Sequence, residues 1–196
     1  MALPIPKLTP EQYLEIERKA QYKSEYFDGE MFAMAGASGT HNDLAAVLIW
    51  ILKNRLAGRG CKVYPSDMRV RTRPNPLYTY PDVTVVCGKP VFEDTENVDV
   101  LTNPKVVIEI LSQSTEAHDR GFKFQKYQTI ESLEEYVLVD QWQPRVERYY
   151  RAPGAAWGEY ADFQGMDATA TLKSLGIEIP LSEIYNEIEF EAPPPR

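Results

Sequence analysis

The chain of 196 residues carries a formal net charge of −8 and has a pI near 4.9. This length suits one domain with a sizeable core. The acidic balance argues against a protein that coats nucleic acid through bulk charge, although it leaves room for a local basic groove. Two cysteines and two histidines are too few for a disulfide framework, a thiolate metal site or a structural zinc. No apolar run reaches the length of a membrane span and residues 1–10 lack a signal-peptide pattern, so we expect a cytoplasmic protein with no membrane partner.

A short helix and a tight hairpin are predicted near the N-terminus. A threonine suited to the N-cap, a proline at the first helical position and a glutamine at the capping-box position predict a helix over residues 9–20. Asp28-Gly29 suits the positive backbone dihedrals of a hairpin between strands over residues 22–27 and 30–35. Glu25 lies in the first strand as either an inward or a solvated carboxylate, and the residues alone favour the solvated position.

A strong amphipathic helix is predicted over residues 40–56. Thr40 and Asp43 resemble a capping box, and Gly58 ends the helix. Its buried stripe consists of Leu44, Val47, Leu48, Ile51, Leu52 and Leu56. His41 therefore lies at a helix N-terminus, where it could help to hold an anion, although a histidine there is more often ordinary surface.

An arginine-rich extended segment is predicted over residues 62–73. Arg69, Arg71 and Arg73 alternate along it and so point to one face. Such charges can protect an edge strand from aggregation or can contact phosphates. The protective role is the commoner one, and the three arginines remain candidate substrate-binding residues.

Two short apolar strands, residues 83–87 and 106–111, carry the main functional signal. Glu109 is the lone carboxylate in a run typical of a central strand covered on both faces. Burying it without a partner is costly, so it needs a cation, either in a structural salt bridge or in a functional site. If the strands are antiparallel neighbours, Asp82 lies next to Glu109. Two converging carboxylates repel each other unless a cation lies between them.

A helix is predicted over residues 119–130, after the Glu109 strand. Steps of 100° place Arg120 and Lys123 on the same broad face as its apolar residues, so Lys123 points toward the sheet, although a lysine can snorkel out of such a position. This helix should form a right-handed crossover to a parallel strand over residues 135–140. The remaining predicted elements are strands over 144–151 and 157–163, and a closing strand and short helix over 172–185.

Asp82, Glu109 and Lys123 are together the components of a magnesium-dependent phosphodiesterase. Mg²⁺ prefers oxygen ligands and typically takes one or two protein carboxylates, waters and a substrate phosphate. The main-chain carbonyl of Ile110 is a further candidate ligand. The metal would polarise the phosphate and activate a water, while Lys123 would orient that water or neutralise charge in the transition state. As a spacing pattern alone, this set is weakly specific.

A combination of motifs is far more specific than any of them alone. The set comprises Pro81-Asp82, residues 107–115, Asp119-Arg120 with Lys123 and Tyr127, Glu135-Tyr136, the hairpin at residues 25–30 and His41. In this combination the chain resembles the Uma-two family of bacterial proteins, described as restriction endonucleases of the PD-(D/E)XK superfamily. The resemblance covers about residues 8–150.

The resemblance implies an α/β fold of the restriction-endonuclease type, with a mixed sheet flanked by helices and an N-terminal helix and β-hairpin. It implies a single domain over residues 1–196, with its core at about 8–150 and a C-terminal extension at 151–196. It also implies an endonuclease that acts on DNA, and we expect a homodimer because two strands must be cut.

The resemblance further implies Mg²⁺ or Mn²⁺ at Asp82 and Glu109, with Lys123 as the catalytic lysine. The chain departs from the superfamily pattern at Leu111, where the motif lysine normally stands; the lysine has moved to the following helix. Because Glu25 matches a recurring family position, it becomes a candidate auxiliary metal ligand. The candidate substrate-binding residues are His41, Arg69, Arg71, Arg73 and Arg120.

Two alternatives to DNA cleavage stay open. The chain could be an inert nucleic-acid-binding or dimerisation module on the same fold. The same residues could also cleave RNA or a nucleotide. No helix-turn-helix or other base-reading module is visible, so the sequence predicts no recognition site.

Overall fold

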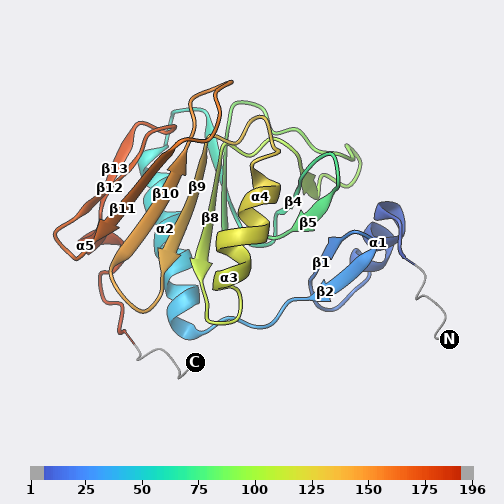
Figure 1. Cartoon of the computed structure of the whole chain (residues 1–196), viewed down its shortest axis with the longest axis horizontal. Helices are drawn as coiled ribbons and strands as arrows, with labels where there is room; N and C mark the ends of the chain where they lie inside the picture. The colour runs from blue at the N-terminus through green and yellow to red at the C-terminus, as the bar shows by residue number, and fades with distance from the viewer. Residues whose placement is uncertain (1–6, 191–196) are drawn as a thin grey trace.

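A mixed six-stranded sheet forms the centre of the computed structural model, which describes residues 7–190 (Figure 1). In spatial order its strands are β11 (Glu159–Gln164), β10 (Arg145–Tyr150), β9 (Glu135–Asp140), β8 (Val106–Leu111), β6 (Val83–Cys87) and β3 (Cys61–Pro65). β8 and β9 are parallel, and all other neighbours in the sheet are antiparallel. The expected α/β class and the parallel crossover from β8 to β9 are confirmed.

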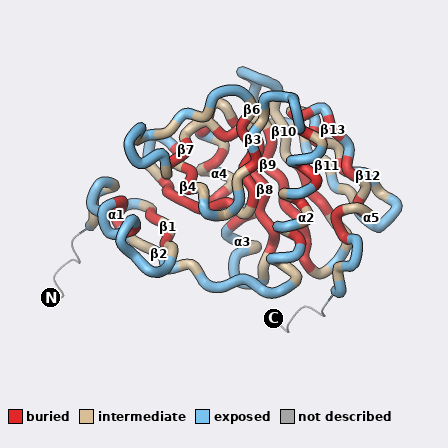
Figure 2. The backbone as a smooth tube through the Cα atoms, turned by 180° about the vertical axis from the view of Figure 1, so that it is seen from behind, coloured by how far each residue is buried: buried red, intermediate tan, exposed pale blue. Residues whose placement is uncertain are grey.

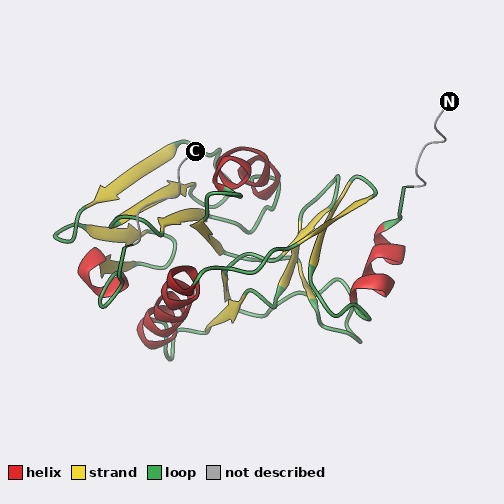
Figure 3. Ribbon diagram, turned by 90° about the horizontal axis from the view of Figure 1, so that it is seen from below, coloured by secondary structure: helices red, strands yellow, loops and turns green. Residues whose placement is uncertain are grey.

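The two faces of this sheet are buried under different layers because side chains alternate along β8. Val106, Ile108 and Ile110 belong to the buried cluster that includes helix α2 (Gly39–Arg55). Val107 and Leu111 belong to a second cluster on the other face. Figure 3 shows helices on both sides of the strands, and Figure 2 shows the buried residues concentrated in the central strands. Glu109 therefore lies on the face opposite α2.

The C-terminal segment completes the core on the α2 side. β12 (Thr169–Leu172) and β13 (Ile177–Pro180) form a separate two-stranded sheet, and α5 (Leu181–Ile184) follows. Leu172, Ile179 and Leu181 are buried in the same cluster as the inner face of α2. The extension beyond residue 150 thus contributes apolar side chains to the main core.

A composite helix covers the opposite face, where a single α-helix over residues 119–130 was predicted. It begins with α3 (Glu116–His118), continues as one π-helical turn, η1 (Asp119–Lys123), and ends with α4 (Phe124–Tyr127). The predicted helix is confirmed as an element, but its predicted start, end and internal geometry are wrong, because it runs from Glu116 to Tyr127 and contains the π turn. A hydrophobic pattern cannot distinguish a π turn from an α turn. Single π turns inside α-helices occur frequently at functional sites.

A second, five-stranded sheet lies beside the first. Its order is β2 (Glu30–Ala33), β1 (Ser24–Phe27), β5 (Leu77–Thr79), β4 (Arg69–Arg71) and β7 (Val100–Leu101). The predicted hairpin is confirmed, with Asp28 at φ 49° and Gly29 at φ 88°. Helix α1 (Pro10–Glu17) has the predicted capping box and packs Tyr13 against Tyr26. Since side chains alternate along β1, Glu25 and Phe27 point away from α1.

Three local features differ from the sequence predictions. The extended segment predicted at residues 62–73 is two strands in different sheets, because a turn closed by the hydrogen bond from Met68 N to Pro65 O redirects the chain. The N-cap of α2 is Ser38, whose hydroxyl accepts from the His41 N–H, and not Thr40. Cys61 and Cys87 are register partners in β3 and β6 and form a disulfide, which the cysteine count alone did not predict.

Within residues 7–190 we find no helix whose length and apolar character would let it cross a bilayer.

Candidate metal-dependent active site

Asp82 and Glu109 lie on neighbouring strands, where the start of β6 meets the end of β8. The antiparallel register pairs Val83 with Ile108, and the next step along both strands sets Asp82 opposite Glu109. Asp82 Oδ2 accepts a hydrogen bond of 2.7 Å from the backbone N–H of Ile110. The antiparallel pairing predicted from the sequence is confirmed, and it brings the two carboxylates together.

The Glu109 carboxylate is almost completely buried, with 4% of its side chain exposed. The Tyr127 hydroxyl donates a 2.8 Å hydrogen bond to Oε1 of Glu109. Burial raises the pKa of Glu109 well above its ordinary value; the nearby Asp119 and Asp82 add to the rise, while Lys123 opposes it. Glu109 therefore holds a proton more readily than an exposed glutamate does when no further cation is present.

Lys123 is the buried cation that the Glu109 strand requires. Its Nζ lies 3.1 Å from Glu25 Oε1, 3.3 Å from Asp119 Oδ1 and 3.5 Å from Glu109 Oε1. Burial disfavours its charge, but the three carboxylates outweigh burial and raise the pKa of Lys123 well above its ordinary value. The lysine thus stays charged beside Glu109, as both a structural ion-pair partner and a group within reach of the site.

Glu25 reaches the site from the second sheet. The register that pairs Tyr26 with Tyr78 places Glu25 beside Thr79, whose hydroxyl donates to Oε1 of Glu25. Only 14% of the Glu25 side chain is exposed, and it points to Lys123. The solvated position that the residues alone favoured is therefore wrong, because the packing of β1 against η1 could not be seen in the local pattern.

His41 holds the second oxygen of Asp82. A hydrogen bond of 2.9 Å joins His41 Nε2 to Asp82 Oδ1, and both side chains are mostly buried. Ser38 caps α2 and so fixes the helix end from which His41 projects. Since Ile110 N–H binds the other oxygen, both oxygens of Asp82 have a fixed direction. His41 is therefore in the site as a positioning contact of Asp82.

Asp119 joins this group, although the sequence did not single it out as a site residue. Its side chain is 3% exposed and lies four residues before Lys123, with which it forms an ion pair across η1. Apart from this ion pair with Lys123, Oδ1 has no hydrogen-bond partner among the described residues. Burial raises the pKa of Asp119, while Lys123 and Thr115 oppose the rise. Its place in the family motif and its helical spacing to Lys123 are the two sequence signals that could have indicated this position.

The donor set suits a divalent ion that keeps most of its own waters. Within residues 7–190, no three His, Cys, Asp or Glu side chains are arranged to hold a metal ion by themselves. Mg²⁺ commonly needs only one or two protein carboxylates, because waters and a substrate phosphate complete its shell. Asp82 and Glu109 can supply those two. Together with Glu25 and Asp119 they outnumber the single ammonium of Lys123, and a divalent cation would offset this excess of negative charge.

The predicted substrate-binding arginines lie elsewhere. Arg69 is buried against the Tyr80 hydroxyl and Asp99, and Arg71 forms an ion pair with Glu93. Arg73 is exposed and follows the end of β4. Arg120 forms ion pairs with Glu116 and Glu147, neither of which belongs to the site. The structure brings none of these four arginines to the Asp82 and Glu109 site.

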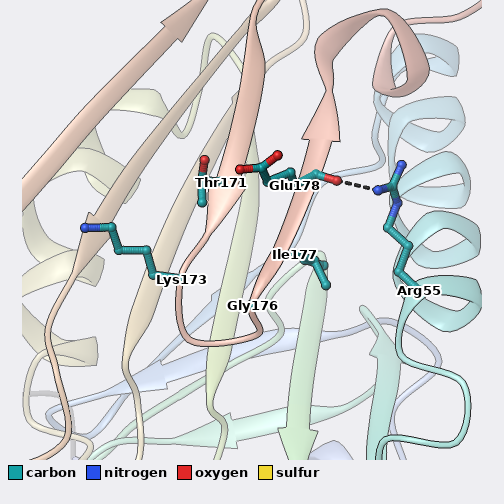
Figure 4. Close-up of a pocket in the computed structure, with 6 residues that line it drawn as sticks. All are labelled: Arg55, Thr171, Lys173, Gly176, Ile177 and Glu178. Carbon is teal, nitrogen blue, oxygen red and sulfur yellow. Dashed lines mark hydrogen bonds between the residues drawn. The ribbon is translucent and has the colours of Figure 1, made fainter.

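A cleft of about 720 Å³ lies on a different part of the molecule and shares no residue with the carboxylate group (Figure 4). It is lined by Arg55, Thr171, Lys173, Gly176, Ile177 and Glu178. Its cations already have partners, since Arg55 binds the Glu178 carbonyl and Glu183 while Lys173 binds Glu159. We therefore assign no chemistry to this cleft.

Replacing Asp119 with Asn is expected to raise the melting temperature at pH 8 in metal-free buffer. The folded-state pKa of Asp119 is raised above that of the unfolded chain, so its carboxylate destabilises the fold as pH rises through and above the unfolded value near 4. Each 1 kcal/mol relieved corresponds to a shift of about 2–4 °C for a chain of this size. Thermal unfolding of wild type and Asp119→Asn at pH 8 and pH 4 measures the difference, which should shrink at pH 4.

Asp162→Asn is the matched control for that measurement. Arg145 hydrogen-bonds to Asp162 and lowers its pKa, so this substitution should leave the melting temperature at pH 8 unchanged or lower it. An unchanged or reduced melting temperature for Asp119→Asn at pH 8 would contradict the raised pKa of Asp119.

Comparisons with known proteins identify the family and the fold of this chain. A family model described as "Uma2: Putative restriction endonuclease" matches residues 10–182. Two uncharacterised Synechocystis proteins are similar to this chain. The protein slr1290 is 35% identical over 95% of this chain and 96% of its own length. The protein sll1609 is 39% identical over 76% of this chain and 84% of its own length. A crystal structure titled as "a putative nuclease belonging to DUF820" from Anabaena variabilis has the same fold, with a TM-score of 0.72, 18% identity, and coverage of 89% of this chain and 96% of that one. The chain belongs to the Uma2 family of restriction-endonuclease-like proteins.

Proposed function

We propose that this protein is an endonuclease that hydrolyses DNA phosphodiester bonds with the help of Mg²⁺ or Mn²⁺. One observation carries the proposal: the strand register places Asp82 beside Glu109, close enough for the charge of Asp82 to raise the pKa of Glu109, and the Lys123 ammonium lies 3.5 Å from Glu109. Carboxylates can hold the metal ion for phosphodiester hydrolysis, and a nearby lysine can stabilise the charge that develops on the phosphate. Membership in the Uma2 family supports nucleic acid as the substrate class.

Each residue has a distinct role in this proposal. Asp82 and Glu109 would hold the ion, with the Ile110 carbonyl and Glu25 as further ligands. The bound ion would polarise the phosphate and make a water more acidic. Lys123 orients the attacking water or offsets the charge that develops on the phosphate.

The positioning residues and the assembly complete the proposal. Because the His41 ring and the Ile110 N–H each bind one oxygen of Asp82, they hold this carboxylate at a fixed angle. The Tyr127 hydroxyl does the same for Glu109. A homodimer would supply two such sites, one for each strand of a duplex.

Plasmid cleavage tests the proposal. In millimolar Mg²⁺ or Mn²⁺ the wild-type chain should convert supercoiled plasmid to open-circular and linear forms, and EDTA should abolish the conversion because the water is no longer activated. A single-stranded RNA of defined length, incubated in parallel, tests the alternative substrate. Agarose and denaturing gels measure both reactions.

Two results would contradict the proposal. Plasmid cleavage that is equally fast in EDTA would remove the metal from the mechanism. The non-catalytic module would be supported instead if the folded chain cleaves no nucleic acid and calorimetry detects no Mg²⁺ binding near millimolar concentration.

A further inference from the structure

A surface cluster of three rings and one lysine borders the carboxylate site. The centroids of Phe27 and Phe122 are 4.7 Å apart, and His118 lies 4.9 Å from Phe122 with the two planes 31° apart. The Lys126 ammonium lies 4.3 Å from the Phe27 centroid, over the face of the ring. His118 is exposed and the other three side chains are half-buried, so the cluster is accessible from solvent. We call these four residues the aromatic patch.

The aromatic patch is fixed to the site by two elements. Glu25 and Phe27 share one face of β1, and both contact η1: Glu25 binds Lys123, and Phe27 packs on Phe122. Phe122 and Lys123 are consecutive in the π turn. A molecule lying on the aromatic patch would therefore be next to Lys123 and the carboxylates.

The charge of Lys126 distinguishes the aromatic patch from the buried ion pairs beside it. Lys123, one turn earlier, is surrounded by three carboxylates. Lys126 makes no ion pair with a carboxylate among residues 7–190 and instead lies over the rings of Phe27 and Phe122. A cation without an acidic partner, beside accessible rings, suits a ligand that carries both a flat π system and negative charge.

Docking of the hairpin explains only part of the aromatic patch. The edge contact between Phe27 and Phe122 holds β1 against η1 and requires these two rings. It requires neither the exposed ring of His118 nor the ammonium of Lys126. These two groups therefore remain for a ligand.

We propose that the aromatic patch stacks an unpaired nucleobase next to the phosphate being cut, so that the substrate is a single strand or a locally opened duplex. This inference rests on the proposed nuclease function and specifies its substrate. Bases stack on aromatic side chains whatever their sequence, and a nearby cation contacts the backbone. A base inside a duplex cannot bind in this way, because its neighbours cover both of its faces.

Binding by the full-length Glu109→Gln chain, which is expected not to cut, tests the proposal. The probes are a 12-nucleotide single strand containing 2-aminopurine, as DNA and as RNA, and a fully paired DNA duplex of the same length. We expect the 2-aminopurine fluorescence to be quenched on binding. Adding His118→Ala and Lys126→Gln should weaken binding of the single strand by about tenfold and of the duplex by less than twofold, because only the single strand can stack.

Trp50→Ala with Lys53→Gln is the matched control, since it removes an exposed aromatic residue and an exposed lysine from α2. This control should leave single-strand affinity unchanged. Three results would overturn the proposal. The patch substitutions could weaken binding of the single strand and of the duplex equally, they could leave single-strand affinity unchanged, or the Glu109→Gln chain could fail to bind a single strand at all. The binding assay requires no cleavage, so loss of this proposal through the binding results is distinguishable from loss of the nuclease proposal through a wild-type chain that fails to cut plasmid.

Discussion

Glu109→Gln is expected to lower plasmid nicking at least about 100-fold while leaving the fold intact. Glutamine has nearly the same shape, and its carbonyl can still accept the hydrogen bond from Tyr127. The substitution removes the charge that would help hold the ion opposite Asp82, so Mg²⁺ affinity should fall together with activity. Initial nicking rates at saturating plasmid, and calorimetric titration with Mg²⁺, measure the two losses.

Glu135→Gln provides the matched control. Glu135 is a fully buried strand glutamate whose pKa is raised by burial, as that of Glu109 is, but it pairs with Val106 at the other end of β8 and binds Ser174. Its replacement should leave nicking and Mg²⁺ uptake close to wild type. If Glu109→Gln nicks plasmid as fast as Glu135→Gln does, Glu109 is not part of the active site.

Much of the architecture could be predicted because its signals are local. The hairpin at Asp28-Gly29, the amphipathic stripe of α2 and the apolar run around Glu109 each specify one element through turn chemistry or periodicity. Predicting the carboxylate pair needed one assumption about long-range structure, namely that β6 and β8 are antiparallel neighbours. That pairing is sufficient to set Asp82 beside Glu109, because both residues occupy the same end of the two strands.

The rest of the site depends on contacts between distant segments. Glu25 points inward only because the second sheet packs against η1, and its register with Thr79 is set by a strand more than fifty residues away. Asp119 contacts Lys123 across a π turn that no hydrophobic pattern reveals. The arginines of β4 alternate as predicted, but Arg69 and Arg71 are bound by Asp99 and Glu93, which lie in a loop whose path the sequence does not specify.

Lys123→Met is expected to separate metal binding from catalysis. Methionine preserves much of the side-chain length and removes the ammonium, which leaves Glu25, Glu109 and Asp119 without their shared cation. Breaking a buried ion pair typically costs about 3–5 kcal/mol, so the metal-free variant should melt well below wild type at pH 8. The more negative site should bind Mg²⁺ at least as tightly as wild type, and bound Mg²⁺ should restore part of the lost stability.

Nicking by Lys123→Met in saturating Mg²⁺ should nevertheless be at least about 100-fold slower, because the Lys123 ammonium no longer orients the water or adds to the ion in offsetting the developing charge. Glu109→Gln should lose Mg²⁺ affinity and activity together, whereas Lys123→Met should lose activity and metal-free stability but keep its Mg²⁺ affinity. Calorimetry, thermal unfolding with and without Mg²⁺, and nicking rates on the same preparations measure this contrast. If the folded, Mg²⁺-loaded Lys123→Met chain nicks plasmid at the wild-type rate, the lysine serves only to neutralise three buried carboxylates, and the water-orienting role proposed for it is wrong.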